Sequence, residues 1–133
     1  QYLYLNIKSK FSFKITFSLD WIKLDGIKKL EKIVNDVISQ KLSKKAGIDL
    51  IVSILENSDE IYLRVKSIDG LRAIYANEKE LFKLLENYLI SDENENVRAA
   101  AAKTIIYIFP DEGYNALKGE KVVNEVIFKN IKI

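Results

Sequence analysis

Paired carboxylates are the side chains in this sequence that most readily suggest chemistry. Asp59-Glu60 and Asp92-Glu93 each follow a serine, and the two pairs stand 33 residues apart. Adjacent acids suit general acid-base catalysis or a divalent cation site. Both pairs, however, precede segments of helical periodicity, and the dipole of a helix favours negative charge where the helix begins. We therefore interpret them as helix-start residues. The acidic run that ends at Glu95 also lacks the ligand spacing and the glycine of a calcium loop.

Composition removes most other chemistry. The 133 residues include no histidine and no cysteine, which excludes disulfides, thiolate and imidazole metal ligands, and Ser-His-Asp triads. The five glycines are scattered, and no glycine-rich phosphate loop is present. We expect no catalysis, no cofactor and no metal site. No apolar run approaches the roughly 18 residues of a membrane span, and no signal peptide is visible. We therefore expect a soluble, cytoplasmic protein with no membrane partner.

Charge is divided unevenly along the chain. Residues 1–45 hold ten Lys or Arg against four Asp or Glu, whereas residues 46–117 hold seven against thirteen. The basic end offers two candidate nucleic-acid sites: the strand lysines near the N-terminus, and Lys41, Lys44 and Lys45 at the turn of the first hairpin. Phosphate affinity requires several converging cations, and the repeats are acidic overall. Nucleic-acid binding through Lys41, Lys44 and Lys45 therefore stands as the alternative function.

The N-terminal segment alternates with a period of two. Apolar residues occupy nearly every odd position from Leu3 to Trp21, which is the pattern of a strand. Because this run exceeds a typical strand, we expect a β hairpin or bent ribbon over residues 1–24. Residues 120–133 end in a similar alternation and predict a C-terminal strand. The ribbon would either pair with this strand or mediate self-association through its edge.

Residues 25–119 carry helical periodicity instead. The apolar spacing predicts helices over about 27–39, from a cap at Ser43, after Ser58, after Asn77 and over about 95–109, with a weaker helix beyond the corner at Pro110. Asn77 and Glu80 have the spacing of a capping box. The residues expected to face inward are Ile27, Leu30, Val34, Val37, Ile38, Ile48, Ile51, Val52, Leu55, Ile61, Val65, Ile68, Leu71, Tyr75, Leu81, Leu84, Leu85, Tyr88, Val97, Ala101, Ile105 and Ile108.

The helical segments repeat. Ser58-Asp59-Glu60 precedes Leu63-Arg64 just as Ser91-Asp92-Glu93 precedes Val97-Arg98, and a shift of 33 residues superimposes the second helices of neighbouring hairpins. A repeat of this length is typical of stacked helical hairpins, which need about three units for stability. We divide the helical part into residues 25–57, 58–90 and 91–119. The predicted fold is mainly α, an α-α superhelix of about three hairpins with a small β element.

The helix pairs, the repeat length and an Asp-x(n)-Val-Arg-x-x-Ala opening resemble the HEAT-repeat family and its shorter HEAT-like relatives. The resemblance covers residues 59–117 well and residues 25–57 loosely. It implies a polar ladder between successive repeats, formed by the aspartate of a turn and the arginine of a helix. The matching positions here are Asp59 or Asp92 and Arg64 or Arg98. In the first repeat no arginine stands at the matching position.

From this architecture we predict a scaffold or adaptor that binds another protein and performs no catalysis. The second helices of the hairpins would line the contact face, and the residues chosen for it are Lys79, Lys83, Glu86 and Tyr88.

Overall fold

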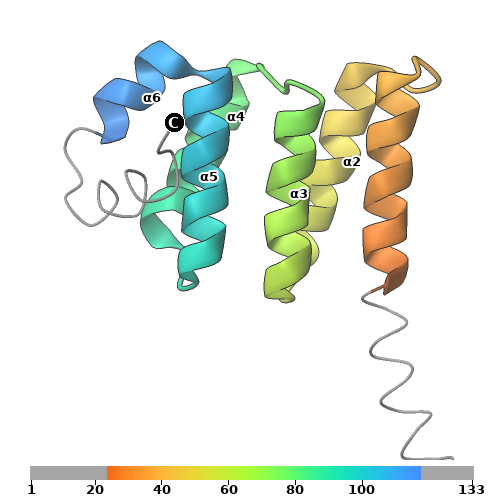
Figure 1. Cartoon of the computed structure of the whole chain (residues 1–133), viewed down its shortest axis with the longest axis horizontal. Coiled ribbons are helices and arrows are strands. Elements are labelled where there is room, and N and C mark those ends of the chain that lie inside the picture. The colour runs from red at the N-terminus through yellow and green to blue at the C-terminus, as the bar shows by residue number, and fades with distance from the viewer. Residues whose placement is uncertain (1–23, 118–133) are drawn as a thin grey trace, which may run out of the picture.

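The computed structural model describes residues 24–117, and within this range all regular secondary structure is helical (Figure 1). The first helix covers residues 24–38, and the others are α2 (Lys44–Asn57), α3 (Ile61–Ala73), α4 (Lys79–Ser91), α5 (Glu95–Ile108) and α6 (Pro110–Leu117). The mainly helical prediction is confirmed. The predicted strands lie outside the described residues, except that Leu24, placed in the ribbon, is helical. The first helix therefore begins earlier than the Asp25-Gly26 boundary predicted from the sequence.

The helices alternate in direction and stand in two layers. In Figure 1 the first helix, α3 and α5 form the front layer, while α2 and α4 lie behind them and run in the same direction as each other. α3 packs directly on α2 and α5, and α5 packs on α4 and α6. This arrangement is compatible with the predicted helical repeat.

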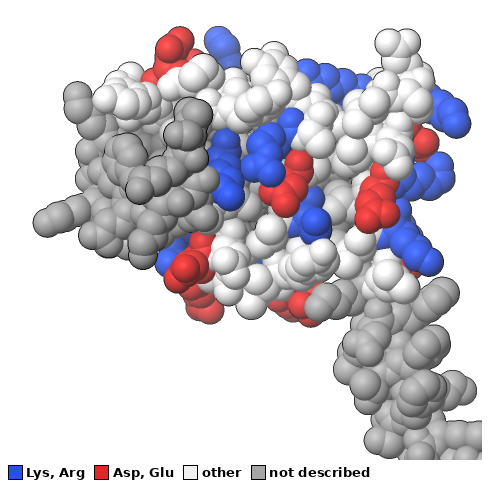
Figure 2. Space-filling view, viewed as in Figure 1, with Lys and Arg blue, Asp and Glu red and all other residues white. Residues whose placement is uncertain are grey.

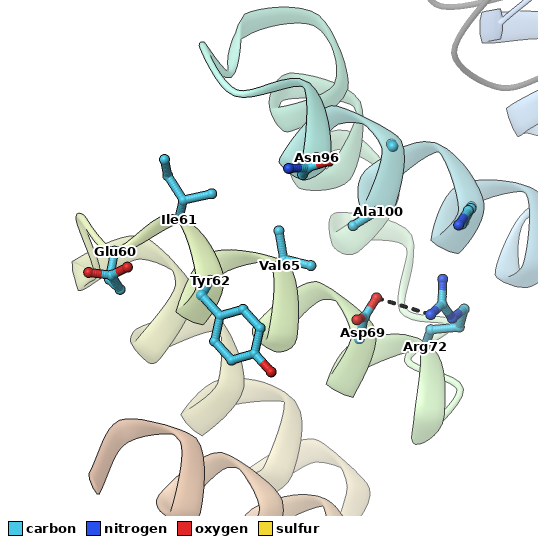
Figure 3. A pocket seen from close by; sticks show the side chains of 10 residues that line it. Glu60, Ile61, Tyr62, Val65, Asp69, Arg72, Asn96 and Ala100 are labelled. Atoms are coloured by element: carbon cyan, nitrogen blue, oxygen red, sulfur yellow. Dashed lines mark hydrogen bonds and ion pairs between the residues drawn. The ribbon is translucent and has the colours of Figure 1, made fainter. Parts of the chain in front are cut away.

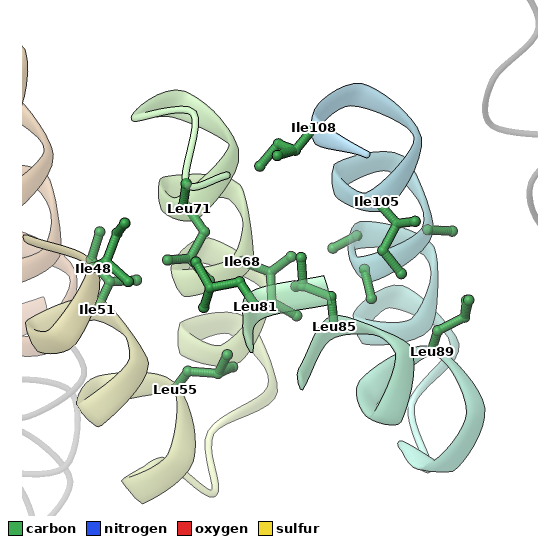
Figure 4. Close-up of a cluster of buried hydrophobic side chains, with 14 of the residues drawn as sticks. Ile48, Ile51, Leu55, Ile68, Leu71, Leu81, Leu85, Leu89, Ile105 and Ile108 are labelled. Atoms are coloured by element: carbon green, nitrogen blue, oxygen red, sulfur yellow. The ribbon is translucent and has the colours of Figure 1, made fainter. Parts of the chain in front are cut away.

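A single apolar core runs through both layers (Figure 4). It forms because apolar residues recur every three or four positions on each helix, so that each helix presents one stripe to its neighbours. Twelve of the residues predicted to face inward are in this core: Leu30, Ile48, Ile51, Leu55, Ile68, Leu71, Leu81, Leu85, Val97, Ala101, Ile105 and Ile108.

Three predicted core positions are wrong. Ile61, in the first turn of α3, is 42% exposed, and Tyr75 is 44% exposed. Ile38, at the end of the first helix, is 63% exposed. Tyr75 fails because α3 has already ended at Ala73, so the helical period no longer applies to it. Its backbone has a φ of 52°, which turns the side chain away from the core.

The first helix and α3 end in the same way. Gln40 N–H donates to the Val37 carbonyl and Lys41 N–H to the Asp36 carbonyl. In α3, Tyr75 N–H donates to the Arg72 carbonyl, and Ala76 N–H donates to the Leu71 carbonyl. This is the Schellman arrangement, which requires a left-handed residue. Gln40, with a φ of 65°, and Tyr75 fill that place where glycine is usual.

The predicted cap at Ser43 and the predicted corner at Pro110 are confirmed. Ser43 caps α2, because its Oγ accepts from Ala46 N–H at 3.2 Å. Phe109 leaves the helical conformation and Pro110 begins α6, as its fixed φ favours. The capping box at Asn77 is wrong. Glu78 is the N-cap of α4 and makes no side-chain capping bond, while Asn77 Oδ1 accepts from Lys44 Nζ at 3.0 Å.

Candidate functional site

The four residues predicted as the partner-binding face do not share one face. Lys79 and Lys83 are exposed, and Glu86 lies about one turn further along the same side of α4. Tyr88 comes nine residues after Lys79, which is about two and a half helical turns, so it lies on the opposite side. The structure therefore separates Tyr88 from the two lysines.

Tyr88 lies instead on the side of α4 that faces α2. Burial raises the pKa of its hydroxyl, the carboxylates of Glu56 and Asp92 raise it further, and the guanidinium of Arg64 acts against them. Tyr88 is thus at the end of a surface shared by α2 and α4, near the turn that leads into α5.

Two of the three lysines of the nucleic-acid alternative contact residues of the next hairpin. Lys44 Nζ donates to Asn77 and lies 5.3 Å from the centre of the Tyr75 ring. Lys45 Nζ lies 3.8 Å from an oxygen of Asp49 and 4.0 Å from an oxygen of Glu78. Lys41 is exposed. Lys45 is therefore paired with carboxylates, and the three lysines do not form the group of converging cations that phosphate binding requires.

The predicted ladder residues are brought together in part. Arg64 Nη2 lies 3.3 Å from Asp92 Oδ1, and the two side chains are only 17% and 8% exposed. Arg64 Nη1 also donates to the Asp59 carbonyl, and Arg98 Nη1 donates to the carbonyls of Asp92 and Glu93. Each arginine therefore secures the turn that precedes its own helix. Among the described residues, Arg64 forms an ion pair with a carboxylate of the next hairpin, and Arg98 does not.

The carboxylate pairs sit at helix starts, as interpreted, but their side chains do not supply the capping bonds. Glu60 is the N-cap of α3 without a side-chain capping bond. At α5 the cap is Asn94, whose side chain accepts from Asn96 N–H at 2.8 Å. Asp92 instead accepts from Asn94 N–H at 2.9 Å and so orders the turn. Within residues 24–117 no group of three or more acids converges as a metal site would require.

A groove of about 490 Å³ lies between α3 and α5 on the front layer (Figure 3). Ile61, Val65 and Ala100 line it, and an ion pair between Asp69 and Arg72 borders it at 3.0 Å. Figure 2 shows this face of the molecule, where basic and acidic side chains are interspersed. The α3–α5 groove therefore offers no uniform charge to a ligand.

A larger groove, of about 770 Å³, lies between α2 and α4. Its floor is apolar and its edges are acidic. The residues of this α2–α4 groove are Lys45, Ile48, Asp49, Val52, Glu56, Glu78, Glu80, Leu81 and Leu84. The floor is accessible mainly through Val52 and Leu84, which are half-buried, since Ile48 and Leu81 are almost fully covered.

Sequence reasoning missed the acidic edges of this groove. A signal was present, because Asp49 and Glu56 flank Val52 on α2 and stand seven residues apart, which places all three on one side of a helix. The acids of α4 could not be joined to them without knowing that α2 and α4 lie side by side.

Comparison of the chain with protein-family models, with curated proteins and with solved structures finds no match. Among residues 24–117, no helix combines the length and the apolar character needed to cross a membrane.

Proposed function

We propose that the chain is a HEAT-like helical-repeat module that binds a polypeptide segment of another protein in the α2–α4 groove. The observation that carries this proposal is the apolar floor around Val52 and Leu84, lined along its length by α2 and α4. Apolar surface that remains accessible in a concave site is typical of an interaction surface.

The shape of the groove favours a chain-like ligand. Its α2 side extends from Lys45 to Glu56, eleven positions that span about 16 Å along a helix. An edge of this length can contact several consecutive side chains of a peptide. Its acids are spread along the edges, and the described residues hold no converging acidic group. Binding therefore explains the arrangement more economically than catalysis.

Site-specific photo-crosslinking in the source cell tests this function. A photoreactive amino acid at Val52 should give covalent adducts with a polypeptide, because Val52 lies in the groove floor. The matched control is the same amino acid at Ala99, a partly buried position in the α3–α5 groove. Adducts at Val52 and few at Ala99 are the expected result. Equal adducts at both positions, or adducts with nucleic acid alone, would contradict the proposal.

A further inference from the structure

We infer that the segment held in the α2–α4 groove is an amphipathic helix of a partner protein, apolar on one stripe and carrying Lys or Arg on both flanks. The inference rests on the proposed function and specifies the chemistry of its ligand.

The charged residues that line the groove are mainly acidic. Asp49 and Glu56 line the α2 edge, and Glu78 and Glu80 line the α4 edge. Four carboxylates and one ammonium give the lining a formal charge of −3. A ligand that covers the floor must pass between two acidic edges, so it needs cations on both of its sides.

These acids are available to a ligand. Lys45 Nζ is 3.8 Å from Asp49 Oδ1 and 4.0 Å from Glu78 Oε2, and its side chain is 72% exposed. Ion pairs of this kind are weak, and a ligand cation can replace them. Glu56 and Glu80 make no ion pair with any other described residue.

The spacing of the acids suits a helix. Asp49 and Glu56 are seven residues apart, about two helical turns or 10.5 Å along α2. A ligand helix lying along the groove places side chains seven residues apart at the same interval, and its apolar stripe recurs every three or four residues. α2 has 14 residues, so a ligand helix of about three to four turns covers the groove.

The α3–α5 groove provides the contrast. Its lining includes Glu60 and Asp69 against Arg72 and Lys103, so its formal charge is balanced. The α2–α4 groove also gains negative potential at the Glu56 end, because α2 runs toward its C-terminus there. The difference in charge therefore favours the α2–α4 groove over the α3–α5 groove as the site for a positively charged ligand.

Selection from a displayed library of random peptides tests the inference with the full chain as bait. Peptides of about fourteen to eighteen residues are long enough to form a helix as long as α2. The bait variants are Glu56→Lys with Glu80→Lys, which reverses charge on both edges, and a matched control, Glu31→Lys with Glu86→Lys. The control makes the same change of charge at positions outside the α2–α4 groove. Glu31, Glu56 and Glu80 are exposed and Glu86 is half-buried, and circular dichroism verifies that each variant is folded.

The expected result is enrichment of peptides with Lys or Arg on both sides of an apolar stripe. Their affinity should fall about tenfold or more for the groove variant, change little for the control, and weaken between about 0.1 M and 1 M salt. Enrichment of neutral, acidic or extended peptides that still compete for the groove overturns the inference and leaves the proposed function standing. If no selected peptide depends on the groove, or if only a second copy of the chain binds there, the inference fails. Absence of groove-dependent peptides together with equal crosslinking at Val52 and Ala99 overturns the proposed function as well.

Discussion

Arg64 reaches two turns of the chain at once. One nitrogen of its guanidinium bonds the Asp59 carbonyl of the turn before α3, and another lies 3.3 Å from the Asp92 carboxylate in the turn before α5. Both side chains are largely buried, so the removal of either leaves a charge without its partner. Arg98 occupies the corresponding place in α5 but bonds only backbone carbonyls among the described residues. The two arginines therefore differ in what they contribute.

A double-mutant cycle separates these contributions. Arg64→Met and Asp92→Asn should each destabilise the fold, by about 3 kcal/mol for a buried pair, with a coupling energy of about 1–3 kcal/mol. The control cycle combines Arg98→Met with Asp92→Asn and should show weaker coupling than the Arg64 cycle, because Arg98 contacts the Asp92 carbonyl and not its carboxylate. Denaturant unfolding measures both cycles. Equal coupling energies in the two cycles would show that the Arg64–Asp92 contact contributes no more than the general electrostatic attraction between nearby charges.

Tyr88 makes a pH-dependent contribution. Burial, Glu56 and Asp92 raise the pKa of its hydroxyl in the folded chain. As the pH rises past about 10, the unfolded chain loses this proton first, so the stabilisation is fully present below that pH and is lost above it. The free energy of unfolding should therefore decline less steeply above pH 10 in Tyr88→Phe than in the parent chain. Tyr107→Phe controls for the loss of a phenol. Identical slopes in Tyr88→Phe and the parent would contradict the assignment.

At the scale of elements, the helices and several of their ends were predictable, whereas the end of α3 and the N-cap of α4 were not. Periodicity located α2 to α5 because each helix packs one stripe of regularly spaced apolar residues into the core. The first helix ends at residue 38, one residue from the predicted 39. The end of α3 was missed because no glycine marks it, and Tyr75 occupies the left-handed position after Ala73. Asn77 was misread because tertiary contact with Lys44 uses its side chain in place of a cap.

Gly47 shows how closely two elements meet. Its close neighbour is a side chain, because an added Cβ would overlap Val37 Cγ2. Gly47→Ala should gain about 1 kcal/mol of helix propensity and lose more to overpacking, which typically costs about 1–3 kcal/mol. We expect net destabilisation in the parent chain and neutrality or a gain in a Val37→Ala background. Thermal unfolding measures both backgrounds.

Gly70→Ala is the milder comparison for this test. Its added Cβ would stand 3.3 Å from Val34 Cγ2, which a small shift can relieve. Destabilisation by Gly47→Ala that is the same with and without Val37 would show that the contact is not its cause.

At the scale of the whole molecule, the sequence indicated an acidic middle segment but not where its charge collects. Asp49 and Glu56 are more than twenty residues from Glu78 and Glu80 in the chain, and only the stacking of α2 beside α4 joins them across one groove. Tyr88 and Lys79 lie on opposite sides of α4 because they are nine residues apart, a separation that the helical period already indicates. A contact face of a helical repeat is a property of neighbouring helices, which a pattern along one helix does not reveal.

The measurement that tests the account most directly is a titration of the isotopically labelled chain with a selected basic amphipathic helix, followed by amide chemical shifts. We predict shifts that concentrate on α2 and α4 around Val52 and Leu84, with the α3–α5 groove around Val65 and Ala100 unchanged. Shifts centred on α3 and α5, or saturable binding that leaves α2 and α4 unaffected, would contradict the claim that the α2–α4 groove is the binding site.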